Sequence, residues 1–224
     1  MRRFVRDNSL SLFFGAIFLL ALLGQAVSGL HEVNNQQLAQ GGEPISMGRY
    51  LTSSHFAVDV TENWQSEYLQ FLLYITATVY LVQRGSPESK PVDEVGPESD
   101  EDQKVGRFAD DDSPEPARTG GLRAALYGHS LGLVMGGIFA LSWLVQSIAG
   151  RVAYNVQRLA DREDPVSWFG YVTGADFWNR TLQNWQSEFL AVASMVVFSI
   201  YLRQRGSPES KPVGAPHSAT GVQG

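Results

Sequence analysis

The pentapeptide Asn63-Trp64-Gln65-Ser66-Glu67 occurs a second time, letter for letter, as Asn184-Trp185-Gln186-Ser187-Glu188. Each copy stands directly before an apolar run of the chain. The match extends well beyond the pentapeptide, because residues 2–92 align without a gap with residues 123–213 at a constant offset of 121. The sequence therefore predicts one structural unit that is present twice in tandem.

Four apolar runs mark the chain, at residues 10–27, 68–82, 131–148 and 189–202. A transmembrane helix needs roughly 20 residues at about 1.5 Å each. The first and third runs reach this length with their flanks. The other two reach it only when they are counted from Trp64 and Trp185, which places both pentapeptides in the outer part of the bilayer. We therefore predict an all-α polytopic membrane protein with four transmembrane helices, arranged as two tandem parallel two-helix repeats.

An acidic segment separates the two halves. Residues 93–118 hold ten acidic residues against three basic ones and almost no large apolar side chains. Such a composition buries too little surface to offset the entropy of ordering. The predicted organisation is a first two-helix membrane repeat (1–92), an acidic disordered cytoplasmic linker (93–121), a second two-helix membrane repeat (122–213) and a disordered tail (214–224).

Charge placement predicts the orientation of these helices. Arg2, Arg3 and Arg6 precede the first apolar run, and basic residues mark the cytoplasmic side of a span. A cleaved signal peptide is the alternative interpretation of residues 1–28, but the repeat makes the first run the counterpart of the internal third run. Four spans with both termini cytoplasmic follow, and the two halves are then related by a pseudo-two-fold axis along the membrane normal.

Small residues follow one another at four-residue steps along the third run, at Gly128, Gly132, Gly136 and Ala140. Small residues at this spacing allow helix backbones to approach closely in lipid. We interpret the stripe as a helix-packing seam, either within the chain or between copies in a homo-oligomer.

The longest identity lies after the second and fourth runs, where the nine residues 84–92, RGSPESKPV, equal residues 205–213. Helix-stop chemistry explains the glycine and proline, but not nine identical residues in a tail. A recent local duplication is one explanation, and a docking motif for a cytoplasmic protein partner is the other.

The doubled NWQSE and RGSPESKP motifs and the SDEDQKVG linker resemble an uncharacterised bacterial family of small multi-pass membrane proteins, known only as a domain of unknown function. The resemblance covers essentially the whole chain. It implies an integral protein of the bacterial inner (plasma) membrane, with the lipid bilayer as its surroundings. It implies no activity and no functional residues.

Polar side chains in the outer part of the predicted bundle are the candidate site. A carboxylate in the hydrocarbon region is costly and is a functional candidate by default. We predict that Glu67, Glu188, Gln25 and Gln146 converge near the pseudo-two-fold axis. The full candidate outer polar cluster is Glu67, Glu188, Gln25, Gln146, Gln65 and Gln186. Either these groups hold the helix ends together, or they form an ion or proton site. Trp64 and Trp185 are predicted as interface anchors, because tryptophan is enriched at bilayer surfaces.

Other chemistries find no support in the sequence. Cysteine is absent, the four histidines lack metal-ligand spacing, and no nucleophile or phosphate-binding motif occurs. We expect no metal, no cofactor, no nucleic-acid partner and no enzymatic activity. The leading hypothesis is a non-enzymatic scaffold or accessory protein. The alternative is a small cation or proton channel or transporter that uses the paired glutamates Glu67 and Glu188 near the outer membrane face.

Overall fold

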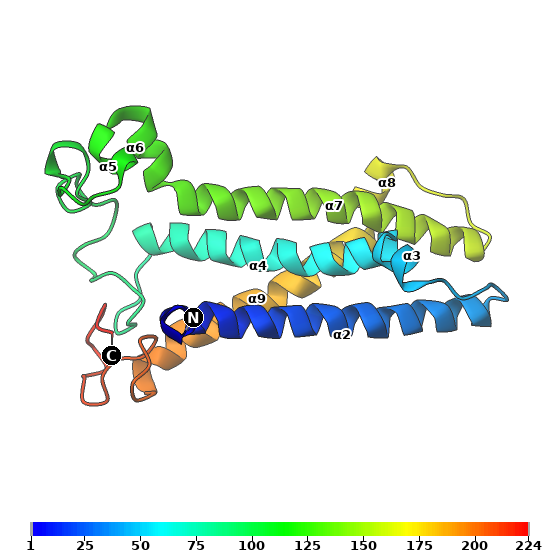
Figure 1. The fold of residues 1–224 in the computed structure, drawn as a ribbon, viewed down its shortest axis with the longest axis horizontal. Coiled ribbons are helices and arrows are strands. Elements are labelled where there is room, and N and C mark those ends of the chain that lie inside the picture. Colours follow the sequence, from blue (N-terminus) through cyan, green and yellow to red (C-terminus); the bar gives the residue numbers. More distant parts are fainter. Residues whose placement is uncertain (1, 224) are drawn as a thin grey trace. The chain divides into compact units, whose positions relative to one another are not determined.

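The computed structural model describes residues 2–223, and in this part of the chain it contains helices and no strand (Figure 1). The prediction of an all-α protein is therefore confirmed. The helices are α1 (Arg2–Asp7), α2 (Ser9–Ala39), α3 (Met47–Leu51), α4 (Ser54–Tyr80), the 3-10 helix η1 (Gly106–Phe108), α5 (Glu115–Thr119), α6 (Gly121–Gly128), α7 (Ser130–Ala160), α8 (Trp168–Val172) and α9 (Ala175–Tyr201).

Two of the described helices, α2 and α7, are long and apolar enough to cross a membrane. Each has 31 residues and a long apolar stretch. Few residues of either stretch are buried inside the protein, so the apolar surface is left to the surroundings. Helices α4 and α9 do not meet the same test of length and hydropathy. The prediction of four spans is thus not confirmed by the fold and stays a prediction.

The chain forms two compact units. The first combines Met1–Val60 with Val145–Tyr171, and the second combines Thr61–Leu144 with Val172–Gly224. Each unit contains residues from both sequence repeats, and α4 and α7 contribute to both units. The predicted division into repeats, linker and tail stays a prediction, and its end residues Met1 and Gly224 lie outside the described residues.

In the first unit, α2 is connected to α3 by a turn that an asparagine closes. The Asn34 side chain accepts a hydrogen bond from the Ile45 amide at 2.7 Å and donates one to the Ile45 carbonyl at 3.2 Å. One turn earlier, Gly29 lies against the hydroxyl of Tyr50, a side chain with no exposed surface. A side-chain amide that pairs with both the N–H and the C=O of one residue satisfies two backbone groups outside a helix.

The same arrangement occurs between α7 and α8, 121 residues further along the chain. Asn155 accepts from the Val166 amide at 2.9 Å and donates to its carbonyl at 3.0 Å. Gly150 lies against the hydroxyl of Tyr171, which is 2% exposed. Trp168 adds a contact of its own by donating to the Ser147 hydroxyl at 3.1 Å. The same asparagine, glycine and tyrosine therefore build equivalent helix–turn junctions in the two repeats.

The ends of α2 and α7 use one backbone conformation with two different residues. Gly41 follows α2 with φ 77°, and Arg162 follows α7 with φ 63°. In both cases the next amide reaches back to a helical carbonyl, from Gly42 to Gln37 and from Glu163 to Arg158, at 2.8 Å. Glycine adopts this left-handed conformation without steric cost, whereas arginine does not.

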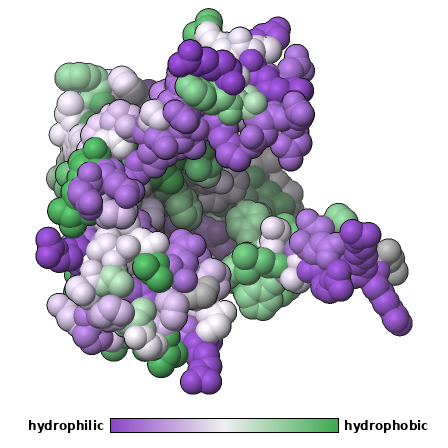
Figure 2. All heavy atoms as spheres, turned by 90° about the vertical axis from the view of Figure 1, so that its left-hand side faces the viewer, coloured by the Kyte–Doolittle hydropathy of each residue, from purple (hydrophilic) through white to green (hydrophobic). Residues whose placement is uncertain are grey.

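In the second unit, the first half of α7 lies beside the second half of α4. A Cβ atom built on Gly136 would lie 3.6 Å from a methyl group of Leu72, an ordinary packing distance, so the two helices are neighbours here. Between α4 and α7 the chain is irregular apart from η1, α5 and α6. The part of this segment with α5 and α6 is at the top of Figure 2, where hydrophilic residues predominate and hydrophobic ones lie among them.

Candidate functional site

The two pentapeptides meet in the second unit through a hydrogen bond between unlike positions. The indole nitrogen Nε1 of Trp185 donates to Oε1 of Gln65 at 2.8 Å. Gln65 has no exposed surface, and its amide nitrogen donates to the Glu62 carbonyl at 3.1 Å. Both ends of this buried amide are satisfied, as a buried polar group requires. Gln65 therefore links α4 to α9.

An ion pair strengthens the same end of the two helices. Arg180 of α9 lies 3.2 Å from the carboxylate of Glu62 on α4 and 3.5 Å from that of Asp176 one turn earlier. The Glu62 side chain is 17% exposed and that of Arg180 is 43% exposed. The hydrogen bond of Gln65 with Trp185 and the ion pair of Glu62 with Arg180 thus hold this end of α4 against α9.

The glutamates of the two pentapeptides are close enough to interact electrostatically. Glu188 is partly buried, while Glu67 is exposed. A shared proton or a bound cation between these two carboxylates stays a prediction.

The other members of the predicted outer cluster are placed differently. Gln25 and Gln146 belong to the first unit, and Gln186 is exposed. Gln146 has no exposed surface, and neither atom of its amide group has a hydrogen-bond partner among the described residues. The convergence of all six residues stays a prediction. So does the anchoring role of Trp64, which is 40% exposed, and of Trp185.

The predicted seam of small residues is divided between two helices. Gly128 ends α6, and Gly132, Gly136 and Ala140 lie on α7. A Cβ atom would meet nothing within 4 Å at Gly128 or Gly132, so only Gly136 has a packing partner among these glycines in the described part. Whether the open positions contact another copy of the chain stays a prediction.

An aromatic cluster that the sequence did not suggest surrounds Trp143. Its ring centroid lies 6.1 Å from those of Phe177 and Trp178 and 6.0 Å from that of Trp185. Thr181 lies on the same helix as three of these rings and has no exposed surface. The Thr181 hydroxyl and the Trp143 indole nitrogen have no hydrogen-bond partner in the part that the structure describes. The spacing 177, 181 and 185 along α9 was the available sequence signal.

The two RGSPESKP copies adopt the same local structure. The hydroxyl of Ser89 accepts from the Gln83 amide at 2.8 Å, and that of Ser210 accepts from the Gln204 amide at 3.0 Å. Gly85 and Gly206 both have positive φ, at 89° and 81°. This folded turn is the physical reason for the serine and glycine at these positions.

The copies differ in their surroundings, because the second unit folds the chain's C-terminal residues around Lys211. Lys211 is 1% exposed. Its ammonium donates to the carbonyls of Gly85, Pro216, His217 and Ala219 at 2.6, 3.3, 3.0 and 3.2 Å. Its burial lowers the pKa of Lys211. Lys211 thus joins the first copy, the second copy and the tail into one assembly.

A carboxyl pair lies within this assembly. The hydroxyl of Tyr74 donates a hydrogen bond to Glu88, and the Glu88 side chain is also hydrogen-bonded to Glu209. Burial raises the pKa of Glu88, and Glu209 raises it further, whereas the Tyr74 hydrogen bond acts in the opposite direction. The equivalent glutamates of the two RGSPESKP copies are thus neighbours, and the raised pKa of Glu88 favours its protonated form.

No group of three or more potential metal ligands occurs among residues 2–223. The family of the chain follows from comparison. The family described as a domain of unknown function, DUF6766, matches residues 1–222. The chain belongs to this family. No curated protein and no solved structure matches the chain significantly.

Proposed function

We propose that this protein is an integral membrane protein of the bacterial inner membrane, with four spans and both termini in the cytoplasm. The apolar, largely unburied helices α2 and α7 support two of the spans. Helices α4 and α9 have 27 residues each, a length of about 40 Å against a hydrocarbon core of about 30 Å. The matching asparagine junctions at residues 34 and 155 support a common fold for the two halves.

Within this architecture the proposed role is that of a non-enzymatic scaffold or accessory protein. The observation that carries the proposal is the joining of both RGSPESKP copies by Lys211. In the first copy residues 85–87 are buried, whereas Arg205, Pro208 and Glu209 of the second copy are exposed. One copy therefore supports the fold, and the other offers its side chains to a cytoplasmic partner protein.

Two exposed arginines at matched positions provide the test. Arg205 and Arg84 are both exposed and open the two copies of the motif. Arg205→Ala is expected to lose a protein that co-purifies at fixed stoichiometry from native membranes, and Arg84→Ala is expected to retain it. Equal retention by both variants, or no such protein with the unaltered chain, contradicts the scaffold role.

A cation or proton pathway is the second candidate, and the electrostatic influence of Glu67 on Glu188 favours it. Four helices are few for a pore, so such a pathway requires oligomerisation. Glu67→Gln and Glu188→Gln are expected to abolish proton or cation flux in liposomes while far-UV circular dichroism stays unchanged. Absence of flux with the unaltered chain rejects this candidate.

A further inference from the structure

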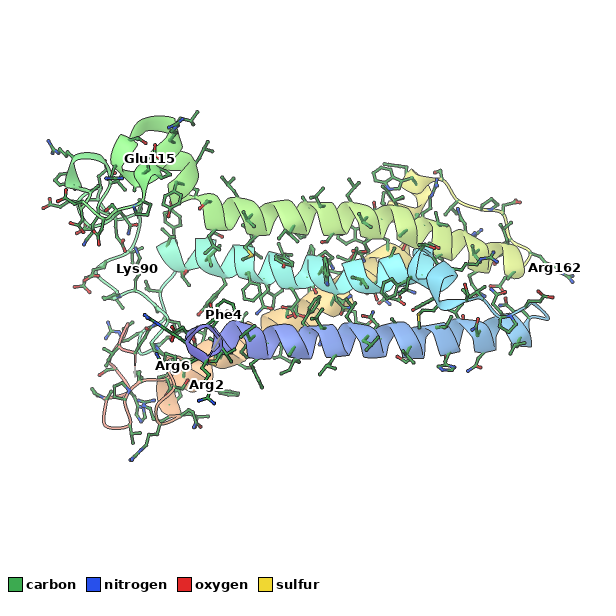
Figure 3. All side chains as sticks on the ribbon, in the orientation of Figure 1. Arg2, Phe4, Arg6, Lys90, Glu115 and Arg162 are labelled. Atoms are coloured by element: carbon green, nitrogen blue, oxygen red, sulfur yellow. The ribbon has the colours of Figure 1, made fainter. Side chains whose placement is uncertain are left out.

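An open cavity lies between α5 and α6 in the second unit. Its volume is about 420 Å³, and it is lined by Glu115, Pro116, Arg123, Leu126 and Tyr127. Glu115 is the first residue of α5 (Figure 3), and the other three large side chains come from α6. One cavity thus combines a cation, an anion, a phenol and an aliphatic side chain.

The two charges that line the cavity are available to a ligand. Neither Glu115 nor Arg123 takes part in an ion pair within residues 2–223. The neighbouring Arg118, by contrast, donates to the carbonyl of Asp111 at 3.3 Å. A ligand that carries one negative and one positive group satisfies Arg123 and Glu115 together, whereas a simple anion satisfies one and is repelled by the other.

The apolar residues of α6 indicate where this ligand comes from. Leu122 is 75% exposed, Leu126 is 53% exposed, and Tyr127 is 46% exposed. Exposed leucines beside an arginine and a tyrosine are typical of a helix that lies in a membrane interface. Only His129 separates α6 from α7, a helix long and apolar enough to cross the bilayer.

We propose that this cavity binds the headgroup of a zwitterionic aminophospholipid of the cytoplasmic leaflet, phosphatidylethanolamine in a bacterial membrane. The inference rests on the proposed membrane insertion of α7. The Arg123 guanidinium binds the lipid phosphate, since its planar donors suit phosphate oxygens. The Glu115 carboxylate accepts hydrogen bonds from the primary ammonium. Leu126 and Tyr127 contact the glycerol and the first acyl carbons.

The charge pattern explains the choice among lipids. A phosphatidylglycerol headgroup carries no cation, so Glu115 repels it. The phosphatidylcholine headgroup is also zwitterionic, but its quaternary ammonium has no N–H to donate to a carboxylate. The primary ammonium of phosphatidylethanolamine has three such donors.

The first sequence repeat provides a matched control. Arg2 of α1 occupies the position that corresponds to Arg123 in the alignment. Arg2 does not line the cavity. Within α1, Arg3 and Arg6 are close to Asp7, at 3.4 and 3.2 Å. Arg2 is therefore a matched arginine outside the proposed lipid site.

The test uses the full chain in nanodiscs made of equal amounts of phosphatidylethanolamine and phosphatidylglycerol. The lipids that stay bound after transfer to detergent are counted by native mass spectrometry. We expect the unaltered chain and Arg2→Gln to retain phosphatidylethanolamine. Arg123→Gln is expected to reduce this retention on the order of tenfold, as the loss of a charge-assisted hydrogen bond predicts. Glu115→Gln is expected to remove the preference over phosphatidylglycerol.

Two results overturn the inference: equal retention of the two lipids by the unaltered chain, and equal retention of phosphatidylethanolamine by Arg123→Gln and Arg2→Gln. Alkaline carbonate extraction of native membranes separates this failure from failure of the proposed function. A chain that resists extraction but shows either result is a membrane protein without this lipid site. A chain that is released by carbonate lacks the membrane insertion on which both proposals depend.

Discussion

Replacing Gly29 by alanine is expected to destabilise the first unit. The added Cβ atom would lie 2.0 Å from the Tyr50 hydroxyl oxygen and 2.9 Å from Cζ of the same ring. The ring cannot move aside easily, because Tyr50 has no exposed surface. Overpacking of this kind costs about 1–3 kcal/mol, and the better helix propensity of alanine returns at most about 1 kcal/mol. We expect a net loss of about 1–2 kcal/mol in the free energy of unfolding.

The Tyr50 hydroxyl provides a second arm of the same test. Within the described residues this buried oxygen has no hydrogen-bond partner, so Tyr50→Phe alone is expected to be nearly neutral. In the Gly29→Ala background, Tyr50→Phe removes the shorter of the two contacts. The two substitutions should therefore be non-additive, with a coupling of about 1 kcal/mol.

The assay is the unfolding of the full chain in mixed micelles by added dodecyl sulfate, followed by far-UV circular dichroism. Gly24→Ala is the matched control, because a Cβ atom on Gly24 meets nothing within 4 Å. It is expected to be neutral or stabilising. Equal stability of Gly29→Ala and Gly24→Ala, or no recovery by Tyr50→Phe, refutes the packing argument.

Three further predictions concern the second unit and the end of α7. Arg162→Gly should raise the free energy of unfolding by about 1 kcal/mol in the same assay, because Arg162 has φ 63°; a loss of stability contradicts this. Trp185→Phe should cost about 1–3 kcal/mol, since it leaves buried Gln65 without its donor; a neutral result shows that water replaces the indole. Burial raises the pKa of Glu88. Protection of residues 83–92 from hydrogen exchange should therefore be greatest below the pKa that this carboxyl has in the unfolded chain. The protection should fall as the pH rises through the raised pKa of the folded protein. Glu209→Gln should weaken that fall, and an unchanged pH profile contradicts the carboxyl pair.

Hydropathy predicted the helical nature of the chain, because long apolar runs without strand-like alternation leave few other solutions. It did not predict the break at His129 between α6 and α7, since this region is apolar on both sides of the break. Hydropathy also does not reveal the role of the matched asparagines Asn34 and Asn155. Their side chains close turns by hydrogen bonds to a residue 11 positions later.

The candidate site was predictable in composition but not in geometry. A repeated NWQSE motif predicts that equivalent residues have equivalent surroundings. The structure instead pairs Gln65 with Trp185 and leaves Gln186, the equivalent of Gln65, exposed. The face of α9 that is turned toward α4 decides which glutamine is buried. The sequence pattern alone does not specify that face. Likewise, the two identical RGSPESKP copies differ in burial because tail residues cover the first copy. The Gly85 amide donates to Thr220, and the Gly221 amide donates to the Ser86 carbonyl.

Accessibility of single cysteines tests the membrane arrangement most directly, because the natural chain has no cysteine to interfere. Cysteine would replace Glu43, Asp112, Asp164 or Ser218, all of which are exposed. Intact cells would then be treated with a membrane-impermeant maleimide. Four spans with cytoplasmic termini predict labelling at positions 43 and 164, and labelling at 112 and 218 only after the cells are opened. Labelling at position 112 in intact cells together with protection at position 164 would show that only α2 and α7 cross the membrane.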